Sequence, residues 1–343
     1  MAFWLIGKMT TYFPIYNVEK YIEKCVRSLF EQTLDDIEYI FVNDCTPDKS
    51  MDILRRVLVE YPQRQEQVKV IDHKVNKGSA TVRNTCLSAA TGEYIGWCDS
   101  DDWVEPDMYE AMYDKAKAEN ADIVCCNYVA EYSYKRVFET YPYLEETKEI
   151  LQTLPPIVLN SAVWNKLIHR NLYTINSIQA YEDINMNEDL GVTLRLRYLS
   201  RKTVIIPKAF YHYNRLNDAS MTVSSNLRYE EDRIQCVRLL EDWFASQPDR
   251  DSYKGMINTI KFAAKAGLFY HPALKNLDRW KNTFPETNKY IWQNRAISFY
   301  DRAAMWLSLH HGGYIAYFMY KVAKPVFRVF KHHLQKLTQF PYK

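Results

Sequence analysis

Glycine is scarce in this chain, with 9 residues in 343, well under half of the usual ~7%. Neither G-x-G-x-x-G nor G-x-x-x-x-G-K-[ST] occurs. Both motifs rely on glycine so that the backbone can approach a phosphate closely. The sequence therefore speaks against a glycine-cradled dinucleotide site and against a P-loop.

Cysteine and histidine also lack the spacings that mark metal or redox sites. The seven cysteines are an odd number without a C-x-x-C pair, which indicates reduced thiols in a cytosolic setting. The eight histidines include no H-E-x-x-H, so we do not expect zinc. No apolar run approaches the ~20 residues of a membrane span, and the apolar run near Met1 is too short for a signal peptide. We expect a cytoplasmic protein.

Charge is present in ordinary amount but is unevenly distributed. The net charge is +2, yet seven Lys/Arg and no acid follow Asp301. The body is therefore mildly acidic, which speaks against nucleic-acid binding by the body. A composition of 47% apolar and 25% charged residues is typical of a soluble globular protein.

Two periodicities alternate over the first 130 residues. Apolar runs predict strands at 37–42, 68–71 and 123–126 and a strand ending at Asp99, and helical spacing predicts helices at 18–30, after Thr46-Pro47, at 80–90 and after Pro106. Such alternation predicts an α/β fold with a mostly parallel sheet covered on both faces. Ligands in these sheets bind at the carboxyl ends of the strands. Polar residues follow four of those ends, at 14–17, 43–44, 76–78 and 99–102.

The rest of the chain changes character. Helices are expected at 164–170, from Asn187 to Leu199 and repeatedly after 226, with short strands at 204–206 and 209–213. We therefore divide the chain into a domain at 1–225 that holds the predicted sheet, with halves at about 9–130 and 131–225, a helical extension at 226–311 and a tail at 312–343.

The most informative stretch is 91–103, where an apolar strand runs into Asp99, Asp101 and Asp102. Carboxylates crowded at a strand end repel one another and lose hydration, so a cation or solvent must compensate them. Oxygen donors of this kind suit a hard divalent ion shared with a phosphate. A solvated acidic loop is the alternative. The position at the end of an apolar strand favours the metal-diphosphate site.

A second acidic pair, Glu188-Asp189, follows Asn187. Such a carboxylate can serve as a general base toward a hydroxyl group. The pair also suits the first turn of a helix capped by Asn187, where acids are favoured. Spacing alone leaves both interpretations open.

Four segments together resemble the family 2 glycosyltransferases, which have a GT-A nucleotide-sugar-binding fold. They are Pro14-Ile15-Tyr16-Asn17-Val18-Glu19, Val42 to Asp48, Asn76-Lys77-Gly78 with 80–84, and Asp99 to Asp102. The resemblance covers residues 12–130 in good register and thins out toward 222. It implies a sugar transferase of the bacterial polysaccharide type that uses a divalent metal, Mn²⁺ or Mg²⁺.

The resemblance also implies roles for individual residues. Asp101, with Asp99, would hold the metal, and Asp189, with Glu188 beside it, would be the base that activates the acceptor hydroxyl. Trp164 and Lys166 would border the acceptor. A larger set would contact the nucleotide-sugar: Pro14, Tyr16, Asn17, Glu19, Asp44, Lys77, Gly78, Arg83, Asp99, Ser100, His212 and Arg215. Asp44, which would accept a hydrogen bond from uracil, favours a UDP-sugar donor.

Two departures from the family pattern stand out. The segment 9–13 is more polar than a usual first strand, so that strand is expected to be short or atypical, and Asn43 replaces a common Asp. Two other functions remain alternatives. A sugar-nucleotide nucleotidyltransferase would open with a glycine-rich loop containing Arg, unlike 14–17. A non-catalytic nucleotide-sugar-binding protein would be favoured only if Asp101 or Asp189 were absent.

The segment 312–343 combines a basic face, with Lys321, Lys324, Arg328 and Lys331, and an apolar face, and Pro325 interrupts it. This pattern predicts a helix that lies on an anionic membrane surface, which would place the protein peripherally at the inner face of the cell membrane. An ordinary packed helix is the alternative. The expected partners are a UDP-sugar donor, a glycan or lipid-linked glycan acceptor and this membrane surface.

Overall fold

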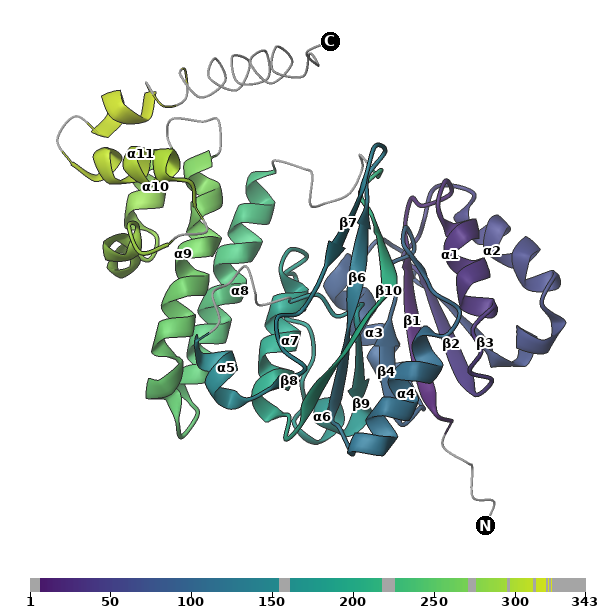
Figure 1. Cartoon of the computed structure of the whole chain (residues 1–343). Helices are drawn as coiled ribbons and strands as arrows, with labels where there is room; N and C mark the ends of the chain where they lie inside the picture. The colour runs from purple at the N-terminus through teal and green to yellow at the C-terminus, as the bar shows by residue number, and fades with distance from the viewer. Residues whose placement is uncertain are drawn as a thin grey trace, which may run out of the picture.

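A mixed sheet forms the centre of the molecule, with helices on both of its faces (Figure 1). The computed structural model describes residues 7–153, 161–217, 226–270, 276–294, 297–310, 313–318, 320 and 322. The strand order is β3-β2-β1-β4-β9-β6-β10-β5, with β7 paired to β6 and β8 paired to β10. The strands are β1 (Met9–Ile15), β2 (Ile37–Asn43), β3 (Val68–Asp72), β4 (Tyr94–Trp97), β5 (Trp103–Val104), β6 (Ile123–Glu131), β7 (Arg136–Glu139), β8 (Glu145–Glu146), β9 (Lys166–His169) and β10 (Thr203–Asn214).

The predicted parallel sheet is present in the first half of the chain. β3, β2, β1 and β4 are parallel neighbours, and β10 is parallel to β6. β9 lies antiparallel between β4 and β6 and joins the two parallel groups. The helices of this half are α1 (Ile22–Phe30), α2 (Ser50–Val59), α3 (Ser79–Ala89) and α4 (Met108–Glu119), with the short η1 (Pro62–Gln67).

The first strand is not short, contrary to one of the two expectations for it. β1 has seven residues, between β2 and β4. Its two threonine side chains are buried and each hydroxyl has a partner, whereas the Tyr12 hydroxyl is buried without one among the described residues. Thr11 Oγ1 lies 2.9 Å from the Tyr109 hydroxyl, and Thr10 Oγ1 donates to Glu38 Oε2 at 2.6 Å. Threonine suits a strand when its hydroxyl has a partner, so this polar sequence forms a central strand.

Three local predictions were wrong. Residues 164–170 are not a helix, because Leu167 and Ile168 pair as strand β9 with both neighbours. Thr46-Pro47 does not begin a helix: α2 starts at Ser50, whose backbone N–H donates to Asp48 Oδ1 at 3.1 Å. The two short strands at 204–206 and 209–213 are one strand, β10, whose register shifts between Ile206 and Tyr211. Pro207 lies in that interval and has no N–H to donate to a neighbouring strand.

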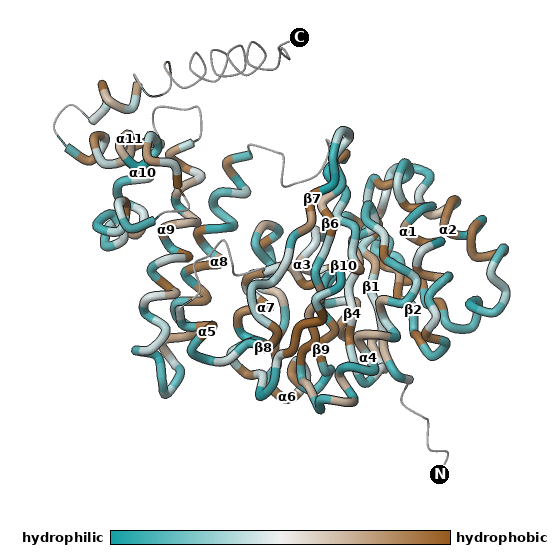
Figure 2. The backbone as a smooth tube through the Cα atoms, viewed as in Figure 1, coloured by the Kyte–Doolittle hydropathy of each residue, from teal (hydrophilic) through white to brown (hydrophobic). Residues whose placement is uncertain are grey.

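The second half adds further helices, which from α8 onward lie beside the sheet, at the left of Figure 1. They are α5 (Lys148–Thr153), α6 (Arg170–Ile175), α7 (Glu188–Leu199), α8 (Leu227–Ala245), η2 (Arg250–Tyr253), α9 (Lys254–Tyr270), α10 (Asn276–Asn282), η3 (Pro285–Tyr290) and α11 (Phe299–Leu309). Figure 2 shows hydrophobic residues gathered around β9 in the middle of the sheet. Among the described helices, none is long and apolar enough to cross a bilayer.

Two hydrophobic clusters meet at α7. Val192 and Leu196 belong to the sheet cluster, while Leu190, Leu194 and Tyr198 belong to the cluster of the helical extension. A helix packed on both sides cannot shift without opening one of the two cores. The first turn of α7, which carries the acidic pair, is therefore held rigidly. The domain boundary at 225 stays a prediction, because α7 contributes to both clusters.

Candidate functional site

The polar loops that follow β1, β2, β3 and β4 bound one cavity of about 1180 Å³ together with the first turn of α7. Most of the residues singled out from the sequence line it: Pro14, Tyr16, Asn17, Asp44, Lys77, Gly78, Arg83, Asp99, Ser100, Asp101, Trp164, Glu188 and Asp189. Four others, Glu19, Lys166, His212 and Arg215, are not among its lining residues. The cavity lies at the carboxyl ends of the parallel strands, where the topology places a ligand site.

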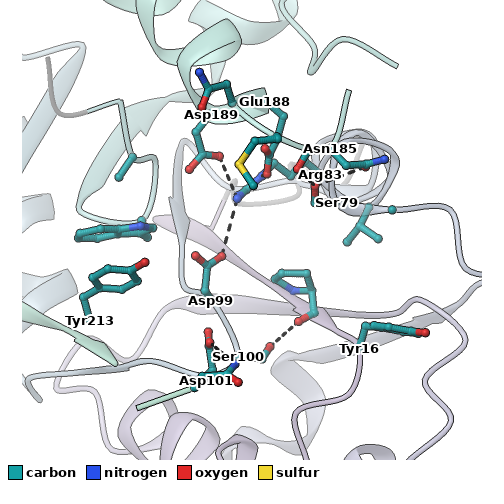
Figure 3. Close-up of a pocket in the computed structure, with 18 of the residues that line it drawn as sticks. Tyr16, Ser79, Arg83, Asp99, Ser100, Asp101, Asn185, Glu188, Asp189 and Tyr213 are labelled. Carbon is teal, nitrogen blue, oxygen red and sulfur yellow. Dashed lines mark hydrogen bonds and ion pairs between the residues drawn. The ribbon is translucent and has the colours of Figure 1, made fainter. Parts of the chain in front are cut away.

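Arg83 on α3 links the two acidic segments of the cavity. Its guanidinium lies 2.9 Å from Asp189 Oδ1 and 3.2 Å from Glu188 Oε1 on α7, and 3.7 Å from Asp99 Oδ1 after β4. Figure 3 shows Asp189 and Asp99 on either side of this guanidinium. The Arg83 side chain also lies over the Trp97 ring, with Cζ 4.8 Å from its centroid. One buried cation is thus shared by carboxylates from two distant parts of the chain.

Two of these carboxylates, Asp99 and Glu188, hold their protons more strongly than usual, because their pKa values are raised. Burial raises the pKa of Asp99 to about 7, with the Asp189 and Asp101 charges adding to it and Arg83 opposing it. Burial, with the Asp189 charge, also raises the pKa of Glu188 to about 7. Burial alone would lower the pKa of Arg83, but the three carboxylates more than offset it, and the pKa is raised. The site therefore carries more negative charge than one arginine can neutralise.

The loop after β4 is fixed by β10. Asp102 is buried, and it accepts hydrogen bonds from the Tyr211 hydroxyl at 2.6 Å and from the Asn214 backbone N–H at 2.7 Å. Asp101 faces the cavity instead, and its Oδ2 accepts from Asn217 Nδ2 at 2.8 Å. Burial raises the pKa of Asp101 as well. Asp102 orients the loop, and Asp101 presents its carboxylate to the ligand space.

Asp44 organises the opposite wall. Its Oδ1 accepts from the backbone N–H of Lys77 at 2.9 Å and lies 2.8 Å from His73 Nδ1, and its Oδ2 accepts from the N–H of Gly78 at 2.9 Å. It thereby fixes the loop after β3 to the end of β2. The hydrogen bond that uracil is expected to donate to Asp44 stays a prediction.

Position 78 requires a glycine because of its backbone conformation. Its φ is +83°, and an added Cβ would lie 2.3 Å from Asn185 Oδ1. A side chain would therefore meet both unfavourable torsion and a steric clash. Asn185 reaches this loop from the segment before α7, and Ala80 N–H donates to its Oδ1 at 3.3 Å.

Aromatic side chains form the end of the cavity away from Tyr16. Trp164 stacks on Tyr213, with ring centroids 5.6 Å apart, and on Tyr211 at 4.2 Å, and Tyr128 meets its edge at 4.8 Å. Figure 3 shows Tyr213 and Tyr16 on opposite sides of the acidic centre. Rings of this kind suit the apolar face of a sugar.

The structure places the remaining candidates elsewhere. His212 lies between Glu131 and Glu105, each 2.8 Å from one ring nitrogen, and it stacks on Trp103. Arg215 is exposed and donates to the Tyr213 hydroxyl at 3.2 Å.

Glu19 and Lys166 also have partners outside the cavity. Glu19 Oε2 accepts from the Lys49 N–H at 3.1 Å. Lys166 is buried and donates to the Tyr141 hydroxyl at 3.2 Å and to the Asn165 side chain at 2.9 Å, and burial lowers its pKa. These four side chains all have partners within the protein itself.

Sequence reasoning did not single out several residues that shape the site. Asn185 contacts the loop after β3, Asn217 holds Asp101, and His73 holds Asp44. Tyr128 and Tyr213 complete the aromatic end. The polar run Glu182-Asp183-Ile184-Asn185-Met186-Asn187 ahead of the acidic pair is a signal that could have pointed to Asn185.

Comparison with known proteins identifies the family. A family model described as Glycosyl transferase family 2 matches residues 11–175. The putative glycosyltransferase EpsH of Bacillus subtilis (strain 168) is 30% identical over 278 residues, 78% of this chain and 76% of EpsH. The uncharacterized glycosyltransferase EpsJ of the same organism is 35% identical over 217 residues, so the match spans about three fifths of its length. The chain belongs to glycosyltransferase family 2.

Solved structures support the fold. Staphylococcus aureus TarS 1-349, crystallised in complex with UDP-GlcNAc, superposes with a TM-score of 0.69 over 93% of this chain and 91% of that chain, at 19% identity. A mannosyltransferase from Pyrobaculum calidifontis, in complex with GDP-Man and Mn²⁺, gives a TM-score of 0.52. The expected GT-A fold with C-terminal helices is confirmed.

Proposed function

We propose that this protein is an inverting glycosyltransferase that moves a sugar from a metal-bound UDP-sugar to a hydroxyl of a glycan or lipid-linked glycan. We place the reaction in cell-surface polysaccharide synthesis. The observation that carries the proposal is the position of Asp189 in the same cavity as Asp99 and Asp101, at the end of the parallel strands. The UDP-GlcNAc complex of TarS, with the same fold, supports a uridine nucleotide.

The residues of the cavity fit a divalent ion that the ligand helps to bind. Asp101 and Asp99 present carboxylates from one loop, and burial raises the pKa of both, an effect that a cation would reverse. Within the described residues no cluster of three or more His, Cys, Asp or Glu side chains is able to hold a metal. Diphosphate oxygens and water would complete the coordination. Such an ion would neutralise the charge that develops on the departing diphosphate.

We assign the two ends of the cavity to the two substrates. Tyr16 is 48% exposed on the cavity wall, beside Pro14 and the loop held by Asp44. Its ring would stack on the uracil of the nucleotide. Tyr213 and Trp164 lie at the other end and would receive the acceptor sugar. The transferred sugar would then lie near Asp99, between nucleotide and acceptor.

Asp189 would take the proton of the acceptor hydroxyl. The hydroxyl oxygen attacks the anomeric carbon from the face opposite the diphosphate, and the bond from that carbon to the diphosphate oxygen breaks with its electron pair. The configuration inverts because there is a single displacement. A base must lie within hydrogen-bond reach of the attacking oxygen, and Asp189 lines the same cavity as Trp164 and Tyr213.

The proposal is tested with a panel of UDP- and GDP-sugars in the presence of Mn²⁺ or EDTA, scoring thermal shift and nucleotide release. We expect a metal-dependent shift with UDP-sugars and release that rises when an acceptor glycan is added. Formation of UDP-sugar from UTP and a sugar 1-phosphate would instead identify a nucleotidyltransferase. A shift without release for any acceptor would leave a binding protein.

The predicted membrane contact through 312–343 falls mostly on residues outside those that the structure describes. The described part begins as a helix at 313–318 and buries Tyr317 against Phe269, with ring centroids 5.1 Å apart. We retain membrane docking of the basic tail as a proposal.

A further inference from the structure

Three exposed aromatic side chains form a cluster on the helical extension. Trp292 follows η3, and Phe299 and Trp306 lie about two turns apart on α11. The Trp292 ring lies 5.8 Å from Phe299 and 6.3 Å from Trp306, centroid to centroid. The exposed fractions are 42% for Trp292, 71% for Phe299 and 41% for Trp306. We call these three residues the aromatic cluster.

The cluster is not a loosely packed part of the core. α11 already buries its other face, through Ala304, Met305 and Ser308. Large aromatic side chains are usually removed from water, and adjacent exposed ones mark a surface that contacts something apolar. The aromatic cluster is therefore a surface without a covering partner among the described residues.

The helical segment that follows α11 in the chain also exposes apolar side chains. Ile315, Phe318 and Val322 are exposed, at the spacing of one helix face. Tyr317 and Tyr320 fix this segment to the helical extension. Their ring centroids lie 5.1 and 5.2 Å from that of Phe269. Figure 1 shows α11 and this segment at the end of the molecule remote from β2 and β3.

Charge identifies the kind of partner. Arg302 lies beside the cluster and donates from Nη1 to the Trp292 carbonyl at 2.9 Å. From Arg302 to the last residue the sequence holds seven Lys/Arg and no acid. Two copies of this end would bring like charges together, whereas an anionic lipid surface would attract it. Tryptophan and basic residues are also the side chains favoured at the interface of a bilayer.

We propose that the aromatic cluster enters the interfacial layer of a bilayer containing anionic lipid, while the basic end of the chain binds the headgroups. Apolar burial and headgroup attraction then act together, as membrane-surface anchoring requires. The proposal is independent of the transfer reaction, since the cluster lies outside the cavity.

The test uses the full chain and vesicles of phosphatidylcholine, with or without ~30% phosphatidylglycerol. Sedimentation should be strong only with the anionic vesicles. Changing Trp292, Phe299 and Trp306 together to Ser should weaken partitioning at least ~10-fold, because the apolar contribution is lost. Changing Tyr134, Phe138 and Ile175 to Ser is the matched control. These exposed apolar side chains lie on the sheet domain, and we expect no effect.

The depth at which Trp292 and Trp306 enter the bilayer is measured independently with brominated lipids, which quench tryptophan fluorescence. The Trp292→Phe/Trp306→Phe variant should still sediment with anionic vesicles but should lose most of the quenching. Changing Lys321, Lys324, Arg328 and Lys331 to Gln should remove the preference for anionic lipid. UDP-dependent thermal shift, measured on every variant, reports that the fold is intact.

Four outcomes would overturn the proposal. Equal sedimentation with neutral and anionic vesicles, or unchanged binding of the triple Ser variant, would exclude this mode of contact. A lipid-free dimer that the triple Ser variant abolishes would identify a second copy as the partner. Shielding of Trp292 and Trp306 from acrylamide, relieved when the residues after 322 are removed, would show that the chain covers its own cluster.

Discussion

Arg83 and Asp189 form an ion pair with 2.9 Å between Nη2 and Oδ1, although they lie on different helices and 106 positions apart in the chain. The same guanidinium is 3.7 Å from Asp99, in the loop that we assign to the donor and metal. Arg83 therefore holds the proposed base and the donor loop in one arrangement. Its Nη1 is buried without a hydrogen-bond partner among the described residues, a position from which it can donate to an incoming anionic group.

We expect Arg83→Lys to lower kcat/KM for transfer at least ~10-fold. The ammonium group of lysine cannot pair with three carboxylates at once, as the planar guanidinium of arginine does. The acidic limb of the pH-rate profile should move to higher pH, since Arg83 lowers the pKa of Glu188 and Asp99 and Lys would do so less well. Arg83→Met should also lose stability, as removing one partner of a buried ion pair typically costs ~3–5 kcal/mol.

Arg55→Lys is the matched control for this change, because Arg55 is exposed on α2 and pairs only with exposed Asp52 among the interactions described. Rates with saturating donor across pH 5.5 to 9 provide the readout. An unchanged pH profile, with the whole loss in KM for the donor, would show that Arg83 serves the diphosphate directly and does not position the base.

Asp101→Asn should abolish metal-dependent binding of UDP and leave the fold intact. The replacement keeps the size of the side chain and its contact with Asn217, but removes a charged oxygen ligand. Titration calorimetry with UDP and Mn²⁺ measures the effect, and Asp52→Asn on the surface of α2 is the control. Unchanged affinity would remove Asp101 from the metal site.

The order of elements and the edge at which the loops converge could be predicted from the sequence, because both follow from apolar runs and from parallel topology. The orientation of His212 could not. Side chains alternate along a strand, and a register shift such as that after Ile206 exchanges the two faces. Pro207 hints at an irregularity, but the sequence does not tell which of His212 and Tyr213 then faces the cavity, where the structure places Tyr213.

Lys166 illustrates a second limit. Its segment reads equally well as a helix or a strand, because the short apolar pair Leu167-Ile168 is buried in either case. Only the pairing of β9 with β4 and β6 decides, and that pairing joins segments that are distant in the chain. The Arg83 network was likewise unreadable, since it depends on how α3 and α7 pack.

Asp189→Asn should retain donor binding and lose at least the ~10²-fold in turnover that is typical of a missing general base. Single-turnover transfer and UDP titration separate the two effects. Asp183→Asn is the control: Asp183 is exposed on the loop before α7, and its φ of +61° is one that Asn adopts readily. If Asp189→Asn loses UDP affinity instead, the residue belongs to the donor side.

The buried acid Glu188 predicts how stability depends on pH. Its folded pKa is about 7, above its ordinary value, so between roughly pH 4.5 and 7 the folded state binds more protons than the unfolded state. The free energy of unfolding of the metal-free protein should therefore fall as pH rises through this window. In Glu188→Gln the decrease in the free energy of unfolding over this pH window should be smaller by about 1–2 kcal/mol. The effect is partial because the carboxylates titrate together. Urea unfolding at pH 5 and pH 8 measures the difference, and an equal pH dependence in both proteins would contradict it.

Gly78→Ala should destabilise the protein and weaken donor binding together. The backbone of Gly78 has φ +83°, and the new Cβ would meet Asn185 at 2.3 Å, so the loop held by Asp44 must move. A positive φ alone costs a non-glycine residue ~1 kcal/mol or more, and the steric clash adds to it.

Gly255→Ala is the matched control, because nothing lies within 4 Å of its Cβ position near the start of α9. That change should leave the free energy of unfolding unchanged or raise it by up to ~1 kcal/mol, since alanine favours a helix. Denaturant unfolding and UDP titration of both variants test the pair. Equal stability of the two variants would mean that the loop adapts without cost and that Gly78 is not needed for its backbone.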